Sequence, residues 1–439
     1  MKKLNFIIKY GLALLLLSFY SCESWLNVTP SDRLSEEMLF NDREGFVKAL
    51  NGVYIELNTN ELYGRNLTAG ALDVMGQYYS VASSSHAFYN YGGLVYTGND
   101  EKALFDNMWQ KCYAVIACCN TIIEKCDENK AGLSPVWKGS IKGEALALRA
   151  MLHFDMLRLF SASPAIDKER KAIPYLESYT NLPQHQLTVG AVLEKVVKDL
   201  NAARELMREV DPYGPNYAKL ESLYRNHPLL RNRQKHLNYY AVLGLKARIC
   251  LYAKDVTAAY GAANEVILAQ QQKGLFPWVK TADITTTEAN LRDRTFSSEH
   301  LFAFNTTKLE EYIKGYFREA SLPLMERLMP GELYEADDYR TALYETYSGF
   351  ANVLTKFWQM DKAYVQGQGY VTPKRNRMPA IRIAEMYYIA AEALKESNIG
   401  EALEMLNTLR VHRGLMKLEN LDKDQLQEEL GREYYREFI

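Results

Sequence analysis

The sequence lacks an excess of charge of either sign. Its 439 residues include 52 Lys and Arg against 54 Asp and Glu, which gives a formal net charge of −2. Proteins that bind nucleic acids usually carry a clear basic excess, so we expect no nucleic-acid partner. A content of 48% hydrophobic and 24% charged residues is typical of a folded globular chain.

The sequence also lacks the short motifs that mark common catalytic and metal sites. It contains no G-x-S-x-G elbow, H-E-x-x-H pair, glycine-rich phosphate loop or EF-hand pattern. His153 lies in a strongly apolar segment, which favours a packed core residue over a general base. We therefore expect no enzyme, no catalytic residue, no metal site and no cofactor. Paired glycosidase carboxylates leave no sequence motif, so a hydrolase stays an alternative.

Cysteine is scarce, and its spacing argues against cross-links. Apart from Cys22, the cysteines are Cys112, Cys118, Cys119, Cys126 and Cys250. Three of them recur every seven residues, which places them on one face of a helix with Cα atoms about 10.5 Å apart. That separation is too long for a disulfide and poor for a shared metal. The sequence predicts buried thiols on a core-facing stripe, no structural disulfide and no zinc site.

Long hydrophobic runs are absent after the first 22 residues. Lys2 and Lys3 precede an apolar run at Leu12–Phe19, and Ser21–Cys22 follows it. This order is typical of a secretory signal, and a Cys at the cleavage point resembles the lipobox of bacterial lipoproteins. We expect a signal peptide at residues 1–21, lipid attachment at Cys22 and a tether over residues 22–35. An uncleaved membrane anchor is disfavoured because a span needs about 20 apolar residues; a plain secretory signal is the other alternative.

Helical periodicity dominates the rest of the chain. The expected helices are 36–57, 67–74, 100–125, 135–160, 189–210 with Thr188 as N-cap, 238–252, 256–271, 380–397, 400–412 and 426–438. Between Lys273 and Pro379 the pattern weakens to loops, short helices and a strand at Phe296–Phe304. Small residues recur at similar offsets in the pairs 238–271 and 380–412, as in tetratricopeptide repeats. The sequence predicts a mainly α, tetratricopeptide-like helical-repeat core with large irregular loop insertions and minor β structure.

Tyrosine is abundant, with 31 residues against 16 Phe and 5 Trp. Several gather among small polar residues in the irregular segment 78–99, where aromatic rings on a loop could stack on the apolar faces of sugars. The candidate ligand-binding residues are Tyr78, Tyr79, Tyr89, Tyr91 and Tyr96. Trp278 and Trp358 are weaker candidates. The alternative is that these rings only fasten the loop to the helices.

Several stretches together resemble the SusD/RagB (starch-utilisation D) family of Bacteroidetes outer-membrane nutrient-binding lipoproteins. They are the start Cys22–Pro30 with Phe40; Trp109–Ile123 with Tyr113 and Asn120; Gly143–Ala150 with Phe154, Leu157 and Phe160; Pro379–Leu415 with Arg410 and Arg413; and Glu433 with Glu437. The segment Ser161–Ile166 departs from the family's usual turn, and residue 439 falls inside a helix that ordinarily continues. We therefore expect residues 36–439 to form a single SusD-like domain with a truncated C-terminus.

The resemblance implies a function at the cell surface. It implies a protein held on the outer membrane by its lipid, facing outside, that captures a glycan or a peptide without chemistry. Its partner would be a SusC-like TonB-dependent transporter, which receives the ligand and which the tyrosine loop could contact. The alternatives are a helical-repeat envelope scaffold that binds no small ligand and, less favoured, an envelope hydrolase.

Overall fold

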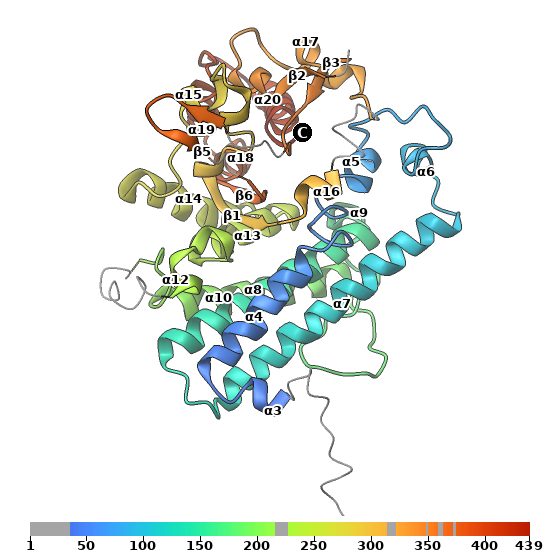
Figure 1. Ribbon diagram of the computed structural model, residues 1–439, viewed down its shortest axis with the longest axis vertical. Helices are drawn as coiled ribbons and strands as arrows, with labels where there is room; N and C mark the ends of the chain where they lie inside the picture. Colours follow the sequence, from blue (N-terminus) through green and yellow to red (C-terminus); the bar gives the residue numbers. More distant parts are fainter. Residues whose placement is uncertain (1–35, 216–226, 314–321, 348–349, 359–362, 372–374) are drawn as a thin grey trace, which may run out of the picture.

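The structure, a computed structural model, describes residues 36–215, 227–313, 322–347, 350–358, 363–371 and 375–439. Cys22, the signal peptide and the tether lie outside the described residues. Figure 1 shows long helices in a lower layer and shorter helices with small β-ladders above them. Among the described helices, none combines the length and the apolar character that a membrane crossing requires.

The first half of the chain supplies the lower layer. Its helices are α3 (Glu36–Leu39), α4 (Arg43–Leu57), α5 (Ala71–Met75), α6 (Tyr89–Gly92), α7 (Asn99–Glu128), α8 (Pro135–Phe160), α9 (Pro164–Asp167) and α10 (Val189–Arg208). The long helices α4, α7, α8 and α10 form the layer itself, whereas α5 and α6 lie beside the upper part of the molecule (Figure 1). The predicted helix over 36–57 is interrupted after Leu39, because Asp42 caps α4 by accepting a hydrogen bond from the Gly45 N–H. A Cβ atom on Gly45 would lie 1.5 Å from the Leu39 carbonyl oxygen, so the tight turn requires glycine there.

Helix α8 is the centre of this layer and packs against both α7 and α10. Two glycines let α8 and α10 approach closely: a Cβ on Gly139 would lie 2.8 Å from the Leu206 carbonyl oxygen, and one on Gly143 would lie 2.5 Å from Met207 Cγ. Thr188 is the N-cap of α10, as predicted, and its hydroxyl accepts from the Ala191 N–H. The small residues of α8 therefore set the spacing of the layer.

The second half contains two antiparallel helix pairs and a further helix. They are α13 (Tyr239–Tyr252) with α14 (Val256–Lys273), α18 (Ile383–Leu394) with α19 (Ile399–Val411), and α20 (Lys423–Phe438). Helix α13 packs on α10, and α14 packs on α18, so the helices form one continuous stack from α7 to α19. This arrangement confirms the mainly α prediction.

Short elements connect the pairs. They are α12 (Pro228–Arg231), η3 (Arg233–Lys235), α15 (Thr281–Thr285), η4 (Ala289–Leu291), η5 (Ser297–Glu299), α16 (Leu309–Ile313), η7 (Glu326–Leu328), α17 (Pro330–Leu333) and η8 (Tyr339–Leu343). The strands are β1 (His300–Asn305), β2 (Tyr344–Tyr347), β3 (Phe350–Leu354), β4 (Ala363–Val365), β5 (Gly369–Val371) and β6 (Arg377–Arg382). They pair antiparallel as β1–β6, β2–β3 and β4–β5.

Two predicted boundaries near the β1–β6 ladder are corrected. The predicted strand over 296–304 begins later, at His300, because residues 297–299 form the 3-10 turn η5. The predicted helix over 380–397 begins at Ile383, because Ala380, Ile381 and Arg382 belong to β6. At Ala380–Arg382, pairing with the distant strand β1 overrides the local helical pattern.

The apolar side chains form two clusters. The main core runs through the helix stack, and a smaller second core lies under the connecting segments 279–354. Cys112, Cys119 and Cys126 are fully buried along one face of α7, which confirms their predicted packing role. All five described cysteines are free thiols.

Candidate functional site

The segment 77–98, which carries the predicted tyrosines, joins α5 to α7 and lies beyond the end of the helical layer (Figure 1). Its first part is fastened to residues 323–325. The Ser80 N–H donates to the Pro323 carbonyl at 2.9 Å, and the Met325 N–H donates to the Tyr78 carbonyl at 2.9 Å. Tyr78 and Tyr79 pack against the second core, and burial raises the pKa of Tyr78 to about 12. These two rings hold the loop in place.

Tyr91 lies at the centre of an aromatic cluster. Its ring centroid is 5.9 Å from that of Phe88, 6.1 Å from Phe105 and 6.4 Å from Tyr96. The side chain is only 3% exposed, so the ring faces its neighbours rather than solvent. The cluster continues along α7 and α8, because Phe105 also packs edge-on against Phe160. Tyr91 therefore fixes the loop onto α7.

Tyr89 and Tyr96 differ from the other three because they are exposed, at 43% and 37%. With the exposed Leu94 and Val95 they form what we call the α6 surface. The segment beneath it is well tied: the Asn90 side-chain amide donates to Glu101 at 2.9 Å. The Val95 N–H also donates to the Asn90 carbonyl at 2.8 Å. Because hydrogen bonds already hold this loop in one conformation, its exposed rings can contact a ligand or partner without the entropic cost of ordering the loop.

The remaining sequence candidates are used in packing. Trp278 stacks on His412 with centroids 4.6 Å apart, and Trp358 is buried. His153 is a core residue, as predicted. Its Nδ1–H donates to the Arg149 carbonyl at 2.9 Å, and its Nε2 accepts from the Leu176 N–H at 3.0 Å. Burial lowers the pKa of His153 to about 3, so the ring is neutral.

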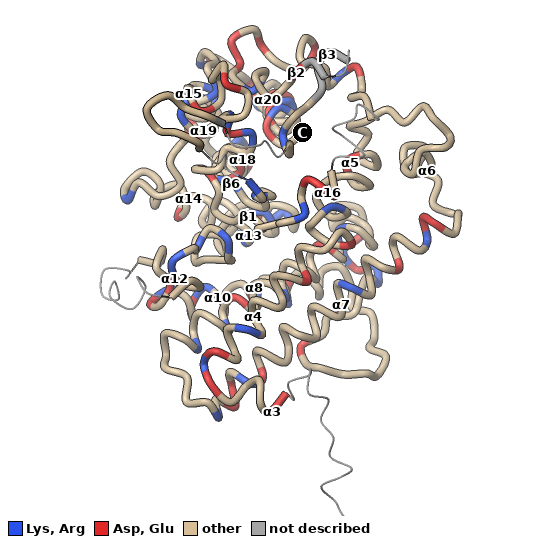
Figure 2. The backbone as a smooth tube through the Cα atoms, viewed as in Figure 1, with Lys and Arg blue, Asp and Glu red and all other residues tan. Residues whose placement is uncertain are grey.

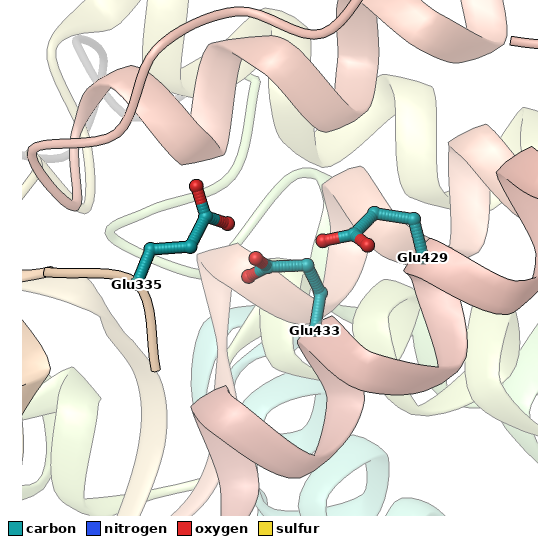
Figure 3. Close-up of side chains that lie close together, drawn as sticks. All are labelled: Glu335, Glu429 and Glu433. Atoms are coloured by element: carbon teal, nitrogen blue, oxygen red, sulfur yellow. The ribbon is translucent and has the colours of Figure 1, made fainter. Parts of the chain in front are cut away.

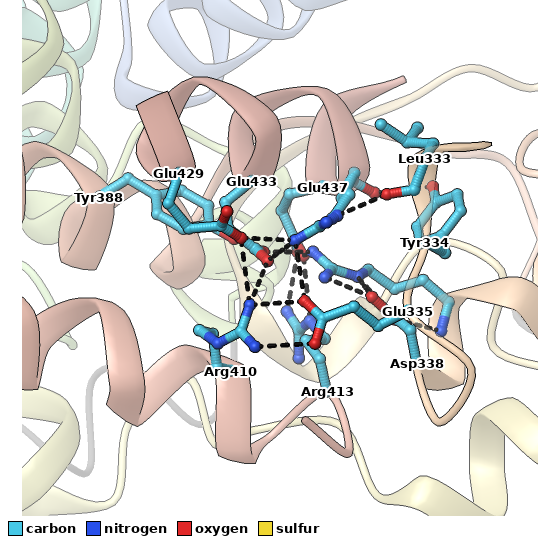
Figure 4. Close-up of polar contacts among 12 residues, drawn as sticks. Leu333, Tyr334, Glu335, Asp338, Tyr388, Arg410, Arg413, Glu429, Glu433 and Glu437 are labelled. Carbon is cyan, nitrogen blue, oxygen red and sulfur yellow. Dashed lines mark hydrogen bonds and ion pairs between the residues drawn. The ribbon is translucent and has the colours of Figure 1, made fainter. Parts of the chain in front are cut away.

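Three carboxylates converge where α20 meets residue 335. Oxygens of Glu335, Glu429 and Glu433 all lie within 4.8 Å of one another (Figure 3). Two guanidinium groups contact these carboxylates. Arg410 contacts Glu335 at 2.8 Å (Figure 4), and Arg436 contacts Glu429 and Glu433 at 2.7 Å each. Because these arginines compensate the negative charge, the cluster is a set of ion pairs rather than a cation site.

The same ion pairs extend into a fully buried network. Arg413 binds both oxygens of Glu299, at 2.9 and 2.7 Å, and both oxygens of Glu437, at 3.0 and 2.8 Å. Arg340 joins Glu433 and Glu437 at 3.0 Å each, and Arg382 reaches Glu437 at 2.7 Å. Burial alone would raise the pKa of Glu437, but these three arginines hold it well below its usual range. Four of the residues that carry the sequence resemblance, Arg410, Arg413, Glu433 and Glu437, are thus structural.

A cavity of about 430 Å³, which sequence reasoning missed, lies between the lower layer and the C-terminal helices. It is lined by aromatic rings, including Tyr63 and Tyr434, and by charged groups. Several of those charged groups have partners within the wall: Arg248 binds Glu385 at 2.6 and 2.7 Å, and the Tyr63 hydroxyl donates to Asp155 at 2.5 Å. The lining comes from segments far apart in sequence, so no local pattern could have predicted it.

Comparison with known proteins agrees with this architecture. A family model described as "Starch-binding associating with outer membrane" matches residues 24–215, and the SusD family model matches residues 278–439. A curated SusD-like protein, P2 of Formosa agariphila, is 24% identical; the alignment spans 98% of this chain and 85% of that protein.

Solved structures share the fold. A putative sugar binding protein from Bacteroides vulgatus has a TM-score of 0.69 at 22% identity, with 91% of this chain and 85% of that chain covered. A SusD superfamily protein from Bacteroides thetaiotaomicron has a TM-score of 0.67 at 22% identity, with 90% and 86% covered. The two family models cover the chain on both sides of residues 216–277, and the helix stack is that of these relatives. The chain therefore belongs to the SusD family.

Proposed function

We propose that this protein is a lipid-anchored, non-catalytic binding protein of the outer cell surface, which captures a glycan or a peptide and passes it to a SusC-like TonB-dependent transporter. Membership of the SusD family supports the surface location and the class of ligand. The observation that carries the site assignment is the pair of exposed rings, Tyr89 and Tyr96, on a loop whose other tyrosines are buried or partly buried.

The chemistry of the α6 surface favours a sugar. Sugars present apolar C–H faces bordered by hydroxyl groups, and a tyrosine offers both a flat apolar ring and a polar hydroxyl. Tyr89 and Tyr96 are the proposed ligand-contacting residues. Tyr78, Tyr79 and Tyr91 are proposed to act in binding by holding the loop in its bound shape, which lowers the ordering cost on binding.

The test is binding of the full-length protein to a glycan array, followed by calorimetry with the best ligand. We expect Tyr89→Ala and Tyr96→Ala each to weaken binding about fivefold to tenfold, because a stacked ring contributes on the order of 1 kcal/mol. Tyr179→Ala is the control, since Tyr179 is 66% exposed but lies outside the loop. If a protein carrying both Tyr89→Ala and Tyr96→Ala bound the ligand with wild-type affinity, the α6 surface would not be the binding site. Binding of no glycan or peptide at all would favour the scaffold alternative.

The proposed anchor has its own test. Cys22→Ser removes the thiol that would carry the lipid, and the protein should move from the membrane fraction to the soluble fraction on cell lysis. Cys118→Ser is the control, because Cys118 is an exposed thiol on α7 with no proposed role in anchoring. Fractionation with metabolic fatty-acid labelling measures both. If the Cys22→Ser protein still incorporated the fatty-acid label and stayed in the membrane fraction, lipid attachment at Cys22 would be contradicted.

A further inference from the structure

The segment 168–188, which joins α9 to α10, forms a loop that is closed at its base and exposed at its tip. At the base, the Ala172 N–H donates to the Leu187 carbonyl at 2.8 Å, and the Leu187 N–H donates to the Ile173 carbonyl at 3.0 Å. Figure 1 shows the loop in green, where it stands out from the lower layer below α7. Compact surface loops whose two ends meet in this way are frequently functional.

Two polar side chains of α7 hold one arm of this loop. The Asn120 side-chain amide donates to the carbonyls of Leu176 and Ser178 at 3.1 Å each. The Tyr113 hydroxyl donates to the Pro174 carbonyl at 2.9 Å. Both side chains belong to the stretch 109–123 that carries the sequence resemblance, and both bind backbone of the loop.

Helices α8 and α10 hold the same arm from the other side. Arg149 of α8 donates to the Glu177 carbonyl at 3.1 Å, and Asp199 of α10 accepts from Arg149 at 2.7 and 2.8 Å. His153 of α8 accepts from the Leu176 N–H at 3.0 Å. A buried guanidinium is costly unless it is paired, so these core groups are committed to the shape of a surface loop.

The tip that these contacts hold, residues 178–186, lacks formal charges. It contains no Asp, Glu, Lys or Arg, although these residues make up 24% of the chain, and the outer part of the loop is tan in Figure 2. All its residues except Thr180 are exposed, among them Tyr179 at 66% and Leu182 at 69%. The centres of protein interfaces are poor in charge and rich in aromatic rings, whereas segments on a lipid surface carry Lys and Arg. The composition of the tip therefore favours a protein partner.

The tip also lies towards the end of the molecule at which the proposed anchor is attached. Helix α3, which begins at Glu36, and the loop both lie near the lower end of the long axis, whereas α6 lies higher (Figure 1). The residues 22–35 that separate α3 from the proposed lipid on Cys22 extend to about 50 Å at most. A protein embedded in the membrane beside the anchor is therefore within reach of this end of the chain.

We propose that the 178–186 tip is a docking surface for the SusC-like transporter, with Tyr179 and Leu182 packed between side chains of an extracellular segment of that protein. The inference rests on the proposed function for the identity of the partner, but it is independent of the α6 surface. Because α7, α8 and α10 already hold the loop, docking orders little additional chain. Burial of the two apolar side chains then contributes to affinity.

Photo-cross-linking tests the surface in cells that produce the full-length lipoprotein together with the transporter. Gln184→Cys, at an exposed tip position, is made in a Cys118→Ser background that lacks the exposed thiol of α7, and is labelled with benzophenone maleimide. Met416→Cys in the same background is the control, because Met416 is 84% exposed and lies between α19 and α20. We expect adducts with extracellular segments of the transporter from position 184 and none from position 416. Adducts only with lipid, with a second copy of this chain or with another protein would overturn the proposal, as would the absence of any adduct.

Co-purification with the affinity-tagged transporter measures the contribution of the tip. Leu182→Glu should lower the co-purified fraction about tenfold, because docking would bury an unpaired carboxylate, whereas Met416→Glu should keep it. Both side chains are exposed, so both variants should keep the thermal midpoint and the glycan binding of the wild type. Full co-purification of Leu182→Glu would overturn the docking surface and leave the proposed function intact. A wild-type protein that does not co-purify would contradict the proposed partner, and this inference with it.

Discussion

At the scale of single residues, the polar core was the hardest part to predict. The sequence indicated a packed role for His153, because a strongly apolar helix surrounds it. It gave no sign that Glu144 and Arg233 are fully buried against each other, because isolated Arg and Glu usually indicate a solvated face. Their pairing joins residues 89 positions apart, which only the folded chain brings together.

The buried histidines predict acid sensitivity. His153 has a folded-state pKa of about 3 against an unfolded value of 6.5, so the unfolded chain binds an extra proton in between. The contribution of the neutral His153 to the free energy of unfolding is therefore fully present above pH 6.5. It is lost as the pH falls from 6.5 towards 3, by about 1.4 kcal/mol per pH unit for each such histidine. His300, with a pKa of about 4, adds to the loss below 6.5.

Urea unfolding between pH 7.5 and 4 measures this effect. His153→Gln should flatten the pH dependence of the free energy of unfolding, while His185→Gln, an exposed histidine, should leave it unchanged. A wild-type protein with constant stability between pH 6.5 and 4.5 would contradict the assignment of a neutral, buried His153.

At the scale of elements, the long helices were predictable and the short ones were not. Residues 135–160, 238–252 and 256–271 were expected as helices and form α8, α13 and most of α14. Their periodicity extends over several turns, which makes the signal strong. The errors occur where a cap or a distant strand decides the boundary, as at Asp42 and at Ala380–Arg382.

A matched pair of glycines tests the packing of α8 on α10. Gly139→Ala should destabilise the protein by about 1–3 kcal/mol, because the new Cβ would lie 2.8 Å from a backbone oxygen of α10. Gly261→Ala, on the exposed face of α14 with no atom within 4 Å, should stabilise by about 0.5–1 kcal/mol. Both values come from denaturant unfolding. Equal effects at the two positions would show that α8 and α10 are not in close contact.

At the scale of the whole molecule, the predicted site divides into a supporting part and an exposed part. The sequence identified the irregular segment 78–99, but it could not tell Tyr91, 3% exposed, from Tyr89, 43% exposed. Burial of Tyr91 depends on Phe105, which belongs to the following helix and is not apparent from the loop itself. The cavity of about 430 Å³ was not predictable either, because its lining comes from segments that only the tertiary fold brings together.

The ion-pair network joins distant parts of the chain and gives the last prediction. Arg413→Ala should cost about 3–5 kcal/mol, because it leaves Glu299 and Glu437 buried with less compensation. Lys423→Ala, which removes an exposed pair with Glu396, should leave the unfolding free energy nearly unchanged. Hydrogen exchange should show faster opening of η8 and α20 in Arg413→Ala but not in α7 or α8. Uniform opening of the whole molecule would contradict a local role for the network.

The position of Glu437 in this network also constrains the order of folding. Arg340, Arg382 and Arg413 all pair with that one carboxylate, which follows them in the sequence, although Arg340 also pairs with Asp338 and Arg413 with Glu299. Before α20 has been synthesised and docked, these three guanidinium groups lack their shared counter-charge, so their burial is unfavourable. In the α7–α8–α10 layer, Glu144 of α8 also pairs outside the layer, but its partner Arg233 precedes α20 in the sequence. We therefore expect the N-terminal helices to fold first and the C-terminal third to stay unfolded until α20 docks. A chaperone would be needed most between these two events, because the C-terminal third is then still exposed.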